Sequence, residues 1–199
     1  MKRILLMLLI CGFSILLTAV NSKLIFTTGS YFPQYEKYKF DSPNIILNAD
    51  IDIFNITDDW GIGGNTMCKF SGSKKQFISM QTYDLYAHKF WNMFTPNSYF
   101  LHGFFGGIKN TNLYYRHHST NQRSKLKMIR PLVGYRFSSE IWGFTVGWTQ
   151  SEQKKSVWEY ELKYREKSGG IMQIGGSLKG PIDNMKSGVY ITFGYEFYL

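Results

Sequence analysis

The chain has 199 residues and a formal net charge of +9, with 19% charged and 18% aromatic residues. This length suits one domain with a packed core or a closed barrel, and two cysteines exclude a disulfide framework. No run of about 18 apolar residues follows residue 22, so no further membrane-spanning helix is expected. We find no motif for a cofactor, a metal ion or nucleic acid, and predict none of them as a partner.

Residues 1–22 have the layout of a secretory signal peptide. Lys2 and Arg3 precede an apolar run, and small or polar residues end at Ser22, where cleavage is predicted. A lipoprotein signal at Cys11 and an uncleaved membrane anchor are the alternatives. A basic exported chain favours contact with anionic lipid head groups or lipopolysaccharide.

The chain after the signal is predicted to consist of strands, because apolar residues recur with a period of two. Residues 23–43 are predicted as a periplasmic lead or as extra strands, and residues 44–199 as the barrel. Ten segments qualify as strands. They are residues 44–56, 60–70, 76–90, 98–108, 111–119, 128–137, 141–150, 157–165, 171–179 and 188–199.

Segments in the second half of the chain carry the sharpest alternation. In residues 141–150, Trp142 and Phe144 share one face while glycine and threonine occupy the other. In residues 157–165, Trp158 and every second residue after it form one apolar and aromatic face, and the residues between them form a charged face. Six charges are predicted to point into the barrel, where they would fill a closed lumen or line a narrow channel. They are Arg130, Arg136, Glu159, Glu161, Lys163 and Arg165.

The positions of the aromatic residues indicate whether the apolar faces contact lipid or the interior of a water-soluble barrel. A water-soluble barrel keeps large apolar side chains inside and charges outside, whereas here Trp, Tyr and Phe flank apolar positions near strand ends. That arrangement is typical of the interfacial girdles of a membrane barrel. We therefore predict lipid-facing apolar sides, with Phe193 among them. A secreted barrel with an aromatic-lined cavity is the alternative.

Connector lengths suggest which turns share a side of the membrane. With a periplasmic C-terminus, residues 71–75, 109–111, 138–140 and 167–170 are predicted as inner turns. The outer loops are then residues 91–98, 120–125, 150–154 and 179–187. The longest connections fall outside, as in bacterial barrels, but the short link at residues 57–59 departs from this trend.

Over essentially its whole mature length, the chain resembles small bacterial outer-membrane β-barrel proteins. Its last strand is similar to the C-terminal signal of that class, with Tyr195 and Phe197 in register and Leu199 where a phenylalanine is usual. The resemblance implies a closed antiparallel barrel of about ten strands in the outer membrane. It also implies the barrel-assembly machinery as a partner.

Residues 113–122, LYYRHHSTNQ, resemble the His-x-Ser-Asn motif of outer-membrane lipid A deacylases and phospholipases. The resemblance implies Ser119 as nucleophile and His117 as its general base, on the face predicted to meet lipid with Leu113 and Tyr115. The families have Asn directly after Ser, whereas here Thr120 intervenes and Asn121 follows. The alternative is a basic loop edge that contacts head groups.

Three functions therefore stay open. The first is an outer-membrane barrel with a structural, adhesion or narrow-permeation role, in contact with outer-membrane lipids and lipopolysaccharide. The second is a serine esterase that acts on lipid A or phospholipid. The third is a secreted soluble barrel that binds a ligand.

Overall fold

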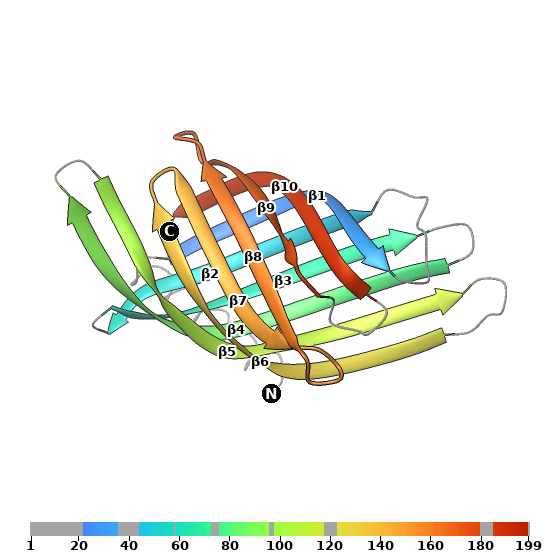
Figure 1. The fold of residues 1–199 in the computed structure, drawn as a ribbon. Coiled ribbons are helices and arrows are strands. Elements are labelled where there is room, and N and C mark those ends of the chain that lie inside the picture. The colour runs from blue at the N-terminus through green and yellow to red at the C-terminus, as the bar shows by residue number, and fades with distance from the viewer. Residues whose placement is uncertain are drawn as a thin grey trace, which may run out of the picture.

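The computed structural model describes residues 22–35, 44–57, 59–72, 76–95, 98–117, 123–179 and 185–198, which form ten β-strands (Figure 1). Within these ranges, no helix has the length and hydropathy to cross a bilayer. The strands are β1 (Ser22–Tyr35), β2 (Ile45–Thr57), β3 (Trp60–Gly72), β4 (Gln76–Thr95), β5 (Ser98–His117), β6 (Arg123–Ser139), β7 (Trp142–Gln150), β8 (Ser156–Arg165), β9 (Gly170–Ser177) and β10 (Met185–Tyr198).

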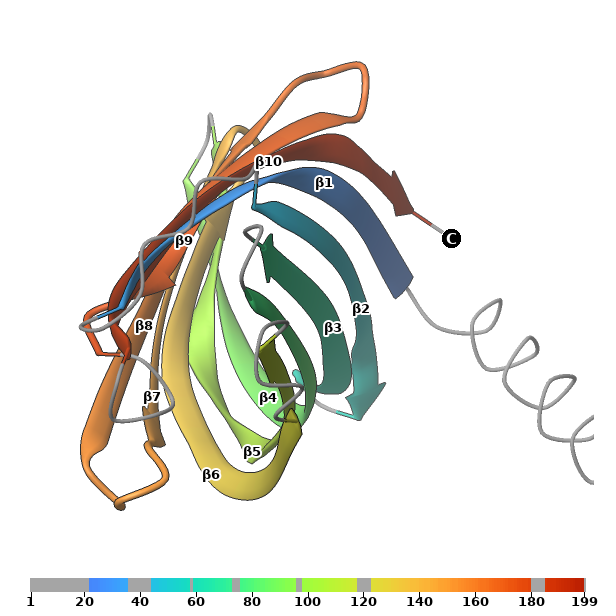
Figure 2. The ribbon, with the colours of Figure 1, turned by 90° about the vertical axis from the view of Figure 1, so that its right-hand side faces the viewer.

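The strands form a closed barrel. Each strand pairs antiparallel with the next in sequence, and β1 pairs with β10 from Lys23↔Tyr198 onward (Figure 2). The predicted closed antiparallel barrel of ten strands is confirmed. Closure pairs the backbone groups that an open sheet leaves free at its two edges.

The ten strands are not the ten that the sequence indicated. Residues 22–35 form β1, so the first part of the segment predicted as a lead or as strands belongs to the barrel wall. Residues 36–43 and the predicted signal peptide, apart from Ser22, lie outside the described residues.

A turn predicted at residues 109–111 is wrong. The segments 98–108 and 111–119 were expected as two strands, but β5 runs unbroken from Ser98 to His117. Lys109 sits in its middle, paired with Asp84 on β4 and Arg130 on β6. The run Lys-Asn-Thr-Asn has the composition of a turn, but pairing with strands on both sides overrides that preference.

This merger changes the side on which two connectors lie. The end of β3 at Gly72 and the start of β4 at Gln76 lie at the rim opposite Ser22 and Tyr198, so the inner turn predicted at residues 71–75 is wrong. The end of β4 at Thr95 and the start of β5 at Ser98 lie at the rim of Ser22 and Tyr198, so the outer loop predicted at residues 91–98 is wrong too. We call the rim that holds Ser22 and Tyr198 the inner rim, and the opposite one the outer rim. At the inner rim the chain connects β2 to β3, β4 to β5, β6 to β7 and β8 to β9. The outer connections join β1 to β2, β3 to β4, β5 to β6, β7 to β8 and β9 to β10. The short link after β2 now fits the trend.

Large apolar side chains point outward along most of the barrel. Trp142 is 47% exposed, Phe144 42%, Trp158 49% and Phe193 57%, as predicted from their parity. Leu113 and Tyr115, predicted to face lipid, instead face the interior, where Leu113 packs with Ile78 and Met80. Their parity is that of Lys109, which also points inward.

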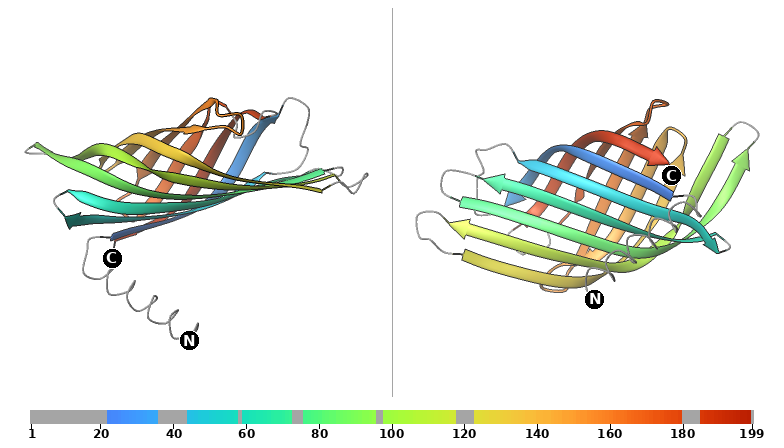
Figure 3. Two further views of the ribbon diagram at one scale, coloured as in Figure 1. Left: turned by 90° about the horizontal axis from the view of Figure 1, so that it is seen from below. Right: turned by 180° about the vertical axis from the view of Figure 1, so that it is seen from behind.

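The barrel has one long wall and one short wall. Strands β4 and β5 have 20 residues each, whereas β7, β8 and β9 have 9, 10 and 8. Figure 3 shows the long strands crossing the short ones on the opposite side of the barrel. Strands β1 and β10 arch between the two walls (Figure 2).

Candidate functional site

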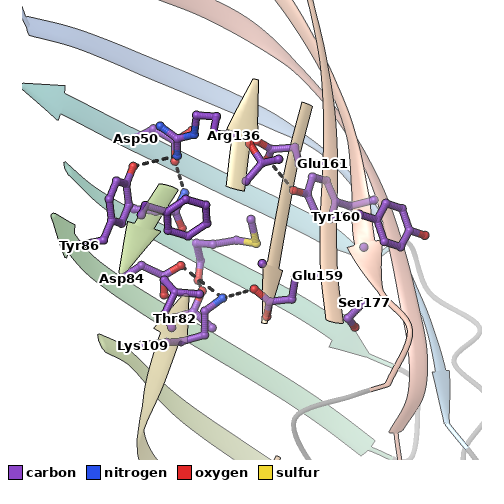
Figure 4. Close-up of a pocket in the computed structure, with 18 of the residues that line it drawn as sticks. Asp50, Thr82, Asp84, Tyr86, Lys109, Arg136, Glu159, Tyr160, Glu161 and Ser177 are labelled. Carbon is purple, nitrogen blue, oxygen red and sulfur yellow. Dashed lines mark hydrogen bonds and ion pairs between the residues drawn. The ribbon is translucent and has the colours of Figure 1, made fainter. Parts of the chain in front are cut away.

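The interior of the barrel is the candidate functional site, because charged side chains from most strands gather there (Figure 4). It carries both signs of charge in nearly equal number. The inward cations are Lys23, Lys69, Lys109, Arg130, Arg136, Lys163 and Arg165, and the inward anions are Asp50, Asp52, Asp84, Glu159, Glu161 and Glu196. The alternation of the strands puts them there, since every second side chain faces the lumen.

Asp52 is the hub of the group nearest the inner rim. Arg136 donates from Nη1 to Asp52 Oδ2 at 2.8 Å, and the Tyr86 hydroxyl donates to Asp52 Oδ1 at 2.7 Å. Lys23 Nζ lies 3.9 Å from the same carboxylate. These groups come from β6, β4 and β1, and the contacts from β6 and β4 join β2 to strands that are not its neighbours in the sheet.

A second group lies around Lys163 on β8. Its Nζ is 3.0 Å from Asp50 Oδ2 on β2 and 2.9 Å from Glu161 Oε1 on its own strand. The Tyr190 hydroxyl donates to Glu161 Oε2 at 2.6 Å. Since β8 and β2 are separated by three strands, the Lys163–Asp50 pair crosses the lumen.

A third group lies nearer the outer rim. Lys109 Nζ sits between Asp84 at 3.3 Å and Glu159 at 2.5 Å, which links β5 to β4 and β8 (Figure 4). Arg130 donates from Nη2 to the Thr111 hydroxyl at 2.6 Å. Lys69 has aromatic faces as neighbours, with Nζ 4.8 Å from the centre of the Tyr31 ring.

Two smaller sets complete the interior. Arg165 donates from Nε to Glu196 Oε2 at 2.8 Å close to the inner rim. The Gln173 side-chain oxygen accepts from Thr27 at 2.9 Å and from Thr192 at 3.0 Å, and all three side chains are buried. The six sequence-predicted lumen charges thus all lie inside, each in contact with a polar partner.

The remaining free space in this region is small. A cavity of about 120 Å³ lies among the second and third groups. Within the described ranges, no three His, Cys, Asp or Glu side chains are placed to hold a metal ion. The arrangement can hold water and small polar groups, while the crossing ion pairs divide the lumen.

Sequence reasoning missed most of the partners of the predicted charges. Asp50 and Asp52 alternate visibly with apolar residues, which is a usable signal for an inward face. Asp84 lies in a segment that is apolar on both parities, and Lys109 was assigned to a turn. Nothing local in the sequence indicates that these two meet Glu159.

The predicted catalytic residues are not placed by the structure. Ser119 and Asn121 lie outside the described residues, and of His117 only the backbone is described, at the end of β5 next to Gln76. The predicted assembly signal is described in part. Tyr195 and Phe197 point outward with 60% and 50% exposure, and Leu199 lies outside the described residues.

The exterior is that of a barrel that spans a membrane. Trp60, Trp91 and Trp142 stand outward near the inner rim, and Lys89 Nζ lies 5.6 Å from the Trp60 ring centre. Nearer the outer rim, Trp148 and Trp158 pair across β7 and β8. Apolar side chains between aromatic girdles, around a charged interior, reverse the layout of a water-soluble barrel.

The comparisons with known proteins found similar solved structures but no match in sequence. No family model and no curated protein matches the chain. Ail, the attachment invasion locus protein of Yersinia pestis, is 14% identical over 89% of this chain and 99% of its own, with a TM-score of 0.45. Neisserial surface protein A is 5% identical over 88% of this chain and 95% of its own, with a TM-score of 0.44. The N-terminal β-barrel domain of Pseudomonas aeruginosa OprF is 13% identical over 89% of this chain and 98% of its own, with a TM-score of 0.43. At such values no function is carried over to this chain.

Proposed function

We propose that the chain is an outer-membrane β-barrel of a diderm bacterium with a structural or surface-adhesion role and a lumen closed to solutes. The observation that carries the proposal is the crossing of the lumen by ion pairs inside an apolar exterior. Arg136–Asp52, Lys163–Asp50 and Lys109–Glu159 each join strands that are not neighbours. A bacterial outer membrane is where barrels of this kind reside.

The apolar exterior supports a membrane location over secretion into water. Leu85 and Phe104 are each 61% exposed, and Phe193 is 57% exposed. In water, a belt of this extent would be an aggregation hazard, whereas hydrocarbon is the environment that such side chains prefer. A secreted ligand-binding barrel would carry the opposite distribution.

The crossing pairs favour a plugged lumen over a narrow channel. Breaking one would leave a buried charge without its partner, which costs several kcal/mol, so thermal opening of all three groups is rare. The permeation role that the sequence left open is therefore the weaker alternative.

Two experiments test this proposal. Membranes from an expressing diderm host are extracted with and without detergent, and the mature chain is expected only in the detergent extract. The purified barrel is then placed in a planar lipid bilayer, where we expect no stable conductance. Release without detergent contradicts the membrane location, and steady ohmic steps that change with Glu161→Ala contradict the closed lumen.

We further propose that residues 1–22 are removed on export and that the barrel-assembly machinery inserts the chain. The removal rests on the signal-peptide layout of residues 1–22. The insertion rests on the outward parity of Tyr195 and Phe197 on the closing strand β10. Replacing both with alanine is expected to reduce the amount of heat-modifiable barrel in the membrane. An unchanged amount contradicts recognition through this strand.

Lipid hydrolysis is the second candidate function, with Ser119 as nucleophile, His117 as base and Asn121 nearby. It rests on the motif similarity of residues 113–122 and on the position of the β5 end at the outer rim. The inward packing of Leu113 weighs against the expected lipid-facing placement. Ser119→Ala is expected to abolish fatty-acid release from lipid A or phospholipid if the hydrolase exists, and equal release dismisses it.

A further inference from the structure

Four cations form a row on the outward face near the outer rim, which we call the basic ladder: Arg116 on β5 and Arg123, Lys125 and Lys127 on β6. Arg116 stands directly opposite Arg123 in the register. Lys125 and Lys127 follow at two-residue steps, and they share parity with Ile129 and Val133, which are 66% and 48% exposed. The ladder thus continues the membrane-facing surface beyond its apolar part.

No anion neutralises the ladder within the described part of the chain. The residues opposite Arg116, Lys125 and Lys127 on the neighbouring strands are Phe77, Tyr114 and Asn112, and the next outward residues on β4 are Ser79 and Gln81. None of these five is acidic. No described carboxylate forms an ion pair with the four cations, in contrast to the paired charges of the lumen. Arg116 Nε is buried and has no hydrogen-bond partner.

The backbone independently places the ladder outside hydrocarbon. Strand β6 pairs with β5 as far as Arg116↔Arg123, but with β7 only from Val133↔Trp148 to Ser138↔Gly143. Residues 123–132 therefore have no strand partner on the β7 side among the described residues, and of their carbonyls that of Pro131 accepts from the Thr149 hydroxyl on β7. Free backbone groups do not occur in contact with hydrocarbon, because each costs several kcal/mol there. This stretch must lie among head groups or in water.

The distance of the basic ladder from the apolar surface indicates which kind of lipid head group it can contact. At about 3.4 Å per residue, Lys127, Lys125 and Arg123 lie roughly 7, 14 and 20 Å along the strand beyond Ile129. A strand tilt of about 40° reduces these lengths to roughly 5, 10 and 16 Å of height. The polar layer of a phospholipid leaflet is only about 5–8 Å thick. The phosphorylated sugars of lipopolysaccharide extend further and offer phosphates along this height.

We propose that the basic ladder and the free edge of β6 bind the phosphorylated sugar head group of lipopolysaccharide at the outer rim. The cations pair with phosphate oxygens, and the free backbone groups of residues 123–129 hydrogen-bond to sugar hydroxyls. This inference rests on the proposed outer-membrane location.

A purely structural role for the ladder explains less of what is observed. Lysine on an unpaired edge prevents pairing with another chain, which accounts for Lys125 and Lys127. Arg116, however, lies on β5, where it pairs with Phe77 of β4 on one side and with Arg123 of β6 on the other. Edge protection gives no reason for its charge.

The test compares two triple variants of equal charge loss in the full-length chain. The ladder variant is Arg123→Gln/Lys125→Gln/Lys127→Gln, and the control is Lys154→Gln/Lys155→Gln/Lys179→Gln, whose exposed side chains lie in outer connections. Purified barrels are titrated with lipopolysaccharide, with phosphatase-treated lipopolysaccharide and with phosphatidylglycerol vesicles. We expect the ladder variant to bind lipopolysaccharide on the order of 100-fold more weakly than the wild type, and the control to change little. Adding Arg116→Gln is expected to weaken binding further.

Each outcome decides the proposal. Loss of binding when the phosphates are removed supports it, and a wild type that prefers phosphatidylglycerol vesicles overturns it as a site for lipopolysaccharide. Equal affinity of ladder variant and wild type overturns it too, and leaves pairing with another protein strand as the use of the free edge. If the ladder variant fails to fold, the wild type still decides: binding that stays unchanged between 50 and 500 mM salt, roughly Debye lengths of 14 and 4 Å, contradicts phosphate pairing. Detergent dependence of extraction reports separately on the membrane location.

Discussion

Asp52 shows how much of the lumen depends on single residues. Its carboxylate is 3% exposed and takes one charge-assisted hydrogen bond from Arg136, one hydrogen bond from Tyr86 and an ion pair with Lys23. Three strands are tied to β2 through this one group. Removing its charge leaves two buried cations with less compensation, which costs more than the pair itself contributes.

We therefore expect Asp52→Asn to lower the free energy of unfolding by about 3–5 kcal/mol, although asparagine keeps the shape and can still accept from Tyr86. Guanidinium unfolding of the barrel in detergent micelles measures the change. The control is Glu152→Gln in an exposed outer connection, which is expected to stay within about 0.5 kcal/mol. A change of similar size in both variants would mean that the lumen carries no such penalty.

At the scale of elements, the seam between β1 and β10 depends on glycines at two places where the two backbones approach each other closely. The two strands arch over the barrel (Figure 2). In their register Gly29 pairs with Thr192, and Gly194 pairs with Thr27. A Cβ built on Gly194 would overlap the carbonyl of Phe26, and one on Gly29 would overlap that of Ile191. Glycine lets the paired strands bend at this corner of the barrel.

Gly194→Ala is accordingly expected to destabilise the barrel by about 1–3 kcal/mol, because the added methyl group forces the seam apart. The fraction of barrel that migrates as folded on an unheated gel, followed against urea, reports the effect. Gly106→Ala is the matched control, since its Cβ would meet Val133 Cγ1 at an ordinary 3.8 Å. Equal stability of the two variants would show that closure does not depend on the seam glycines.

At the scale of the whole molecule, all five tryptophans lie on the outward parity. Four are at least 40% exposed: Trp60, Trp91, Trp142 and Trp158. The fifth, Trp148, is half-buried and shares its face with Trp142. Indole rings prefer the interface between water and hydrocarbon, so the membrane should surround them.

Vesicles that contain brominated acyl chains are therefore expected to quench most of the tryptophan emission of the inserted barrel, whereas aqueous iodide should quench little of it. Unfolding in urea should reverse this order, because the rings then reach water. Strong iodide quenching of the folded barrel would contradict a membrane around the apolar belt.

The sequence predicts whether a side chain points into or out of the barrel far better than it predicts which side chain it contacts. The outward position of Trp142 and Phe193 follows from a period of two, which is a local property of any strand. Which carboxylate meets Lys163 depends on how β8 and β2 come together after closure, and no neighbouring residue encodes that. The unbroken β5 was missed for a related reason: Lys109 and its polar neighbours face groups far away in sequence, yet locally they have the composition of a turn.

An even number of strands brings both described ends to one rim, with Ser22 and Tyr198 beside each other in the seam. An antibody epitope fused beyond Tyr198 would therefore face the same compartment as one inserted between Ser22 and Lys23, after the predicted cleavage site. An epitope spliced into residues 151–155 would face the other compartment and be reachable on intact cells. The strand count alone thus dictates where a reporter must be inserted to be displayed.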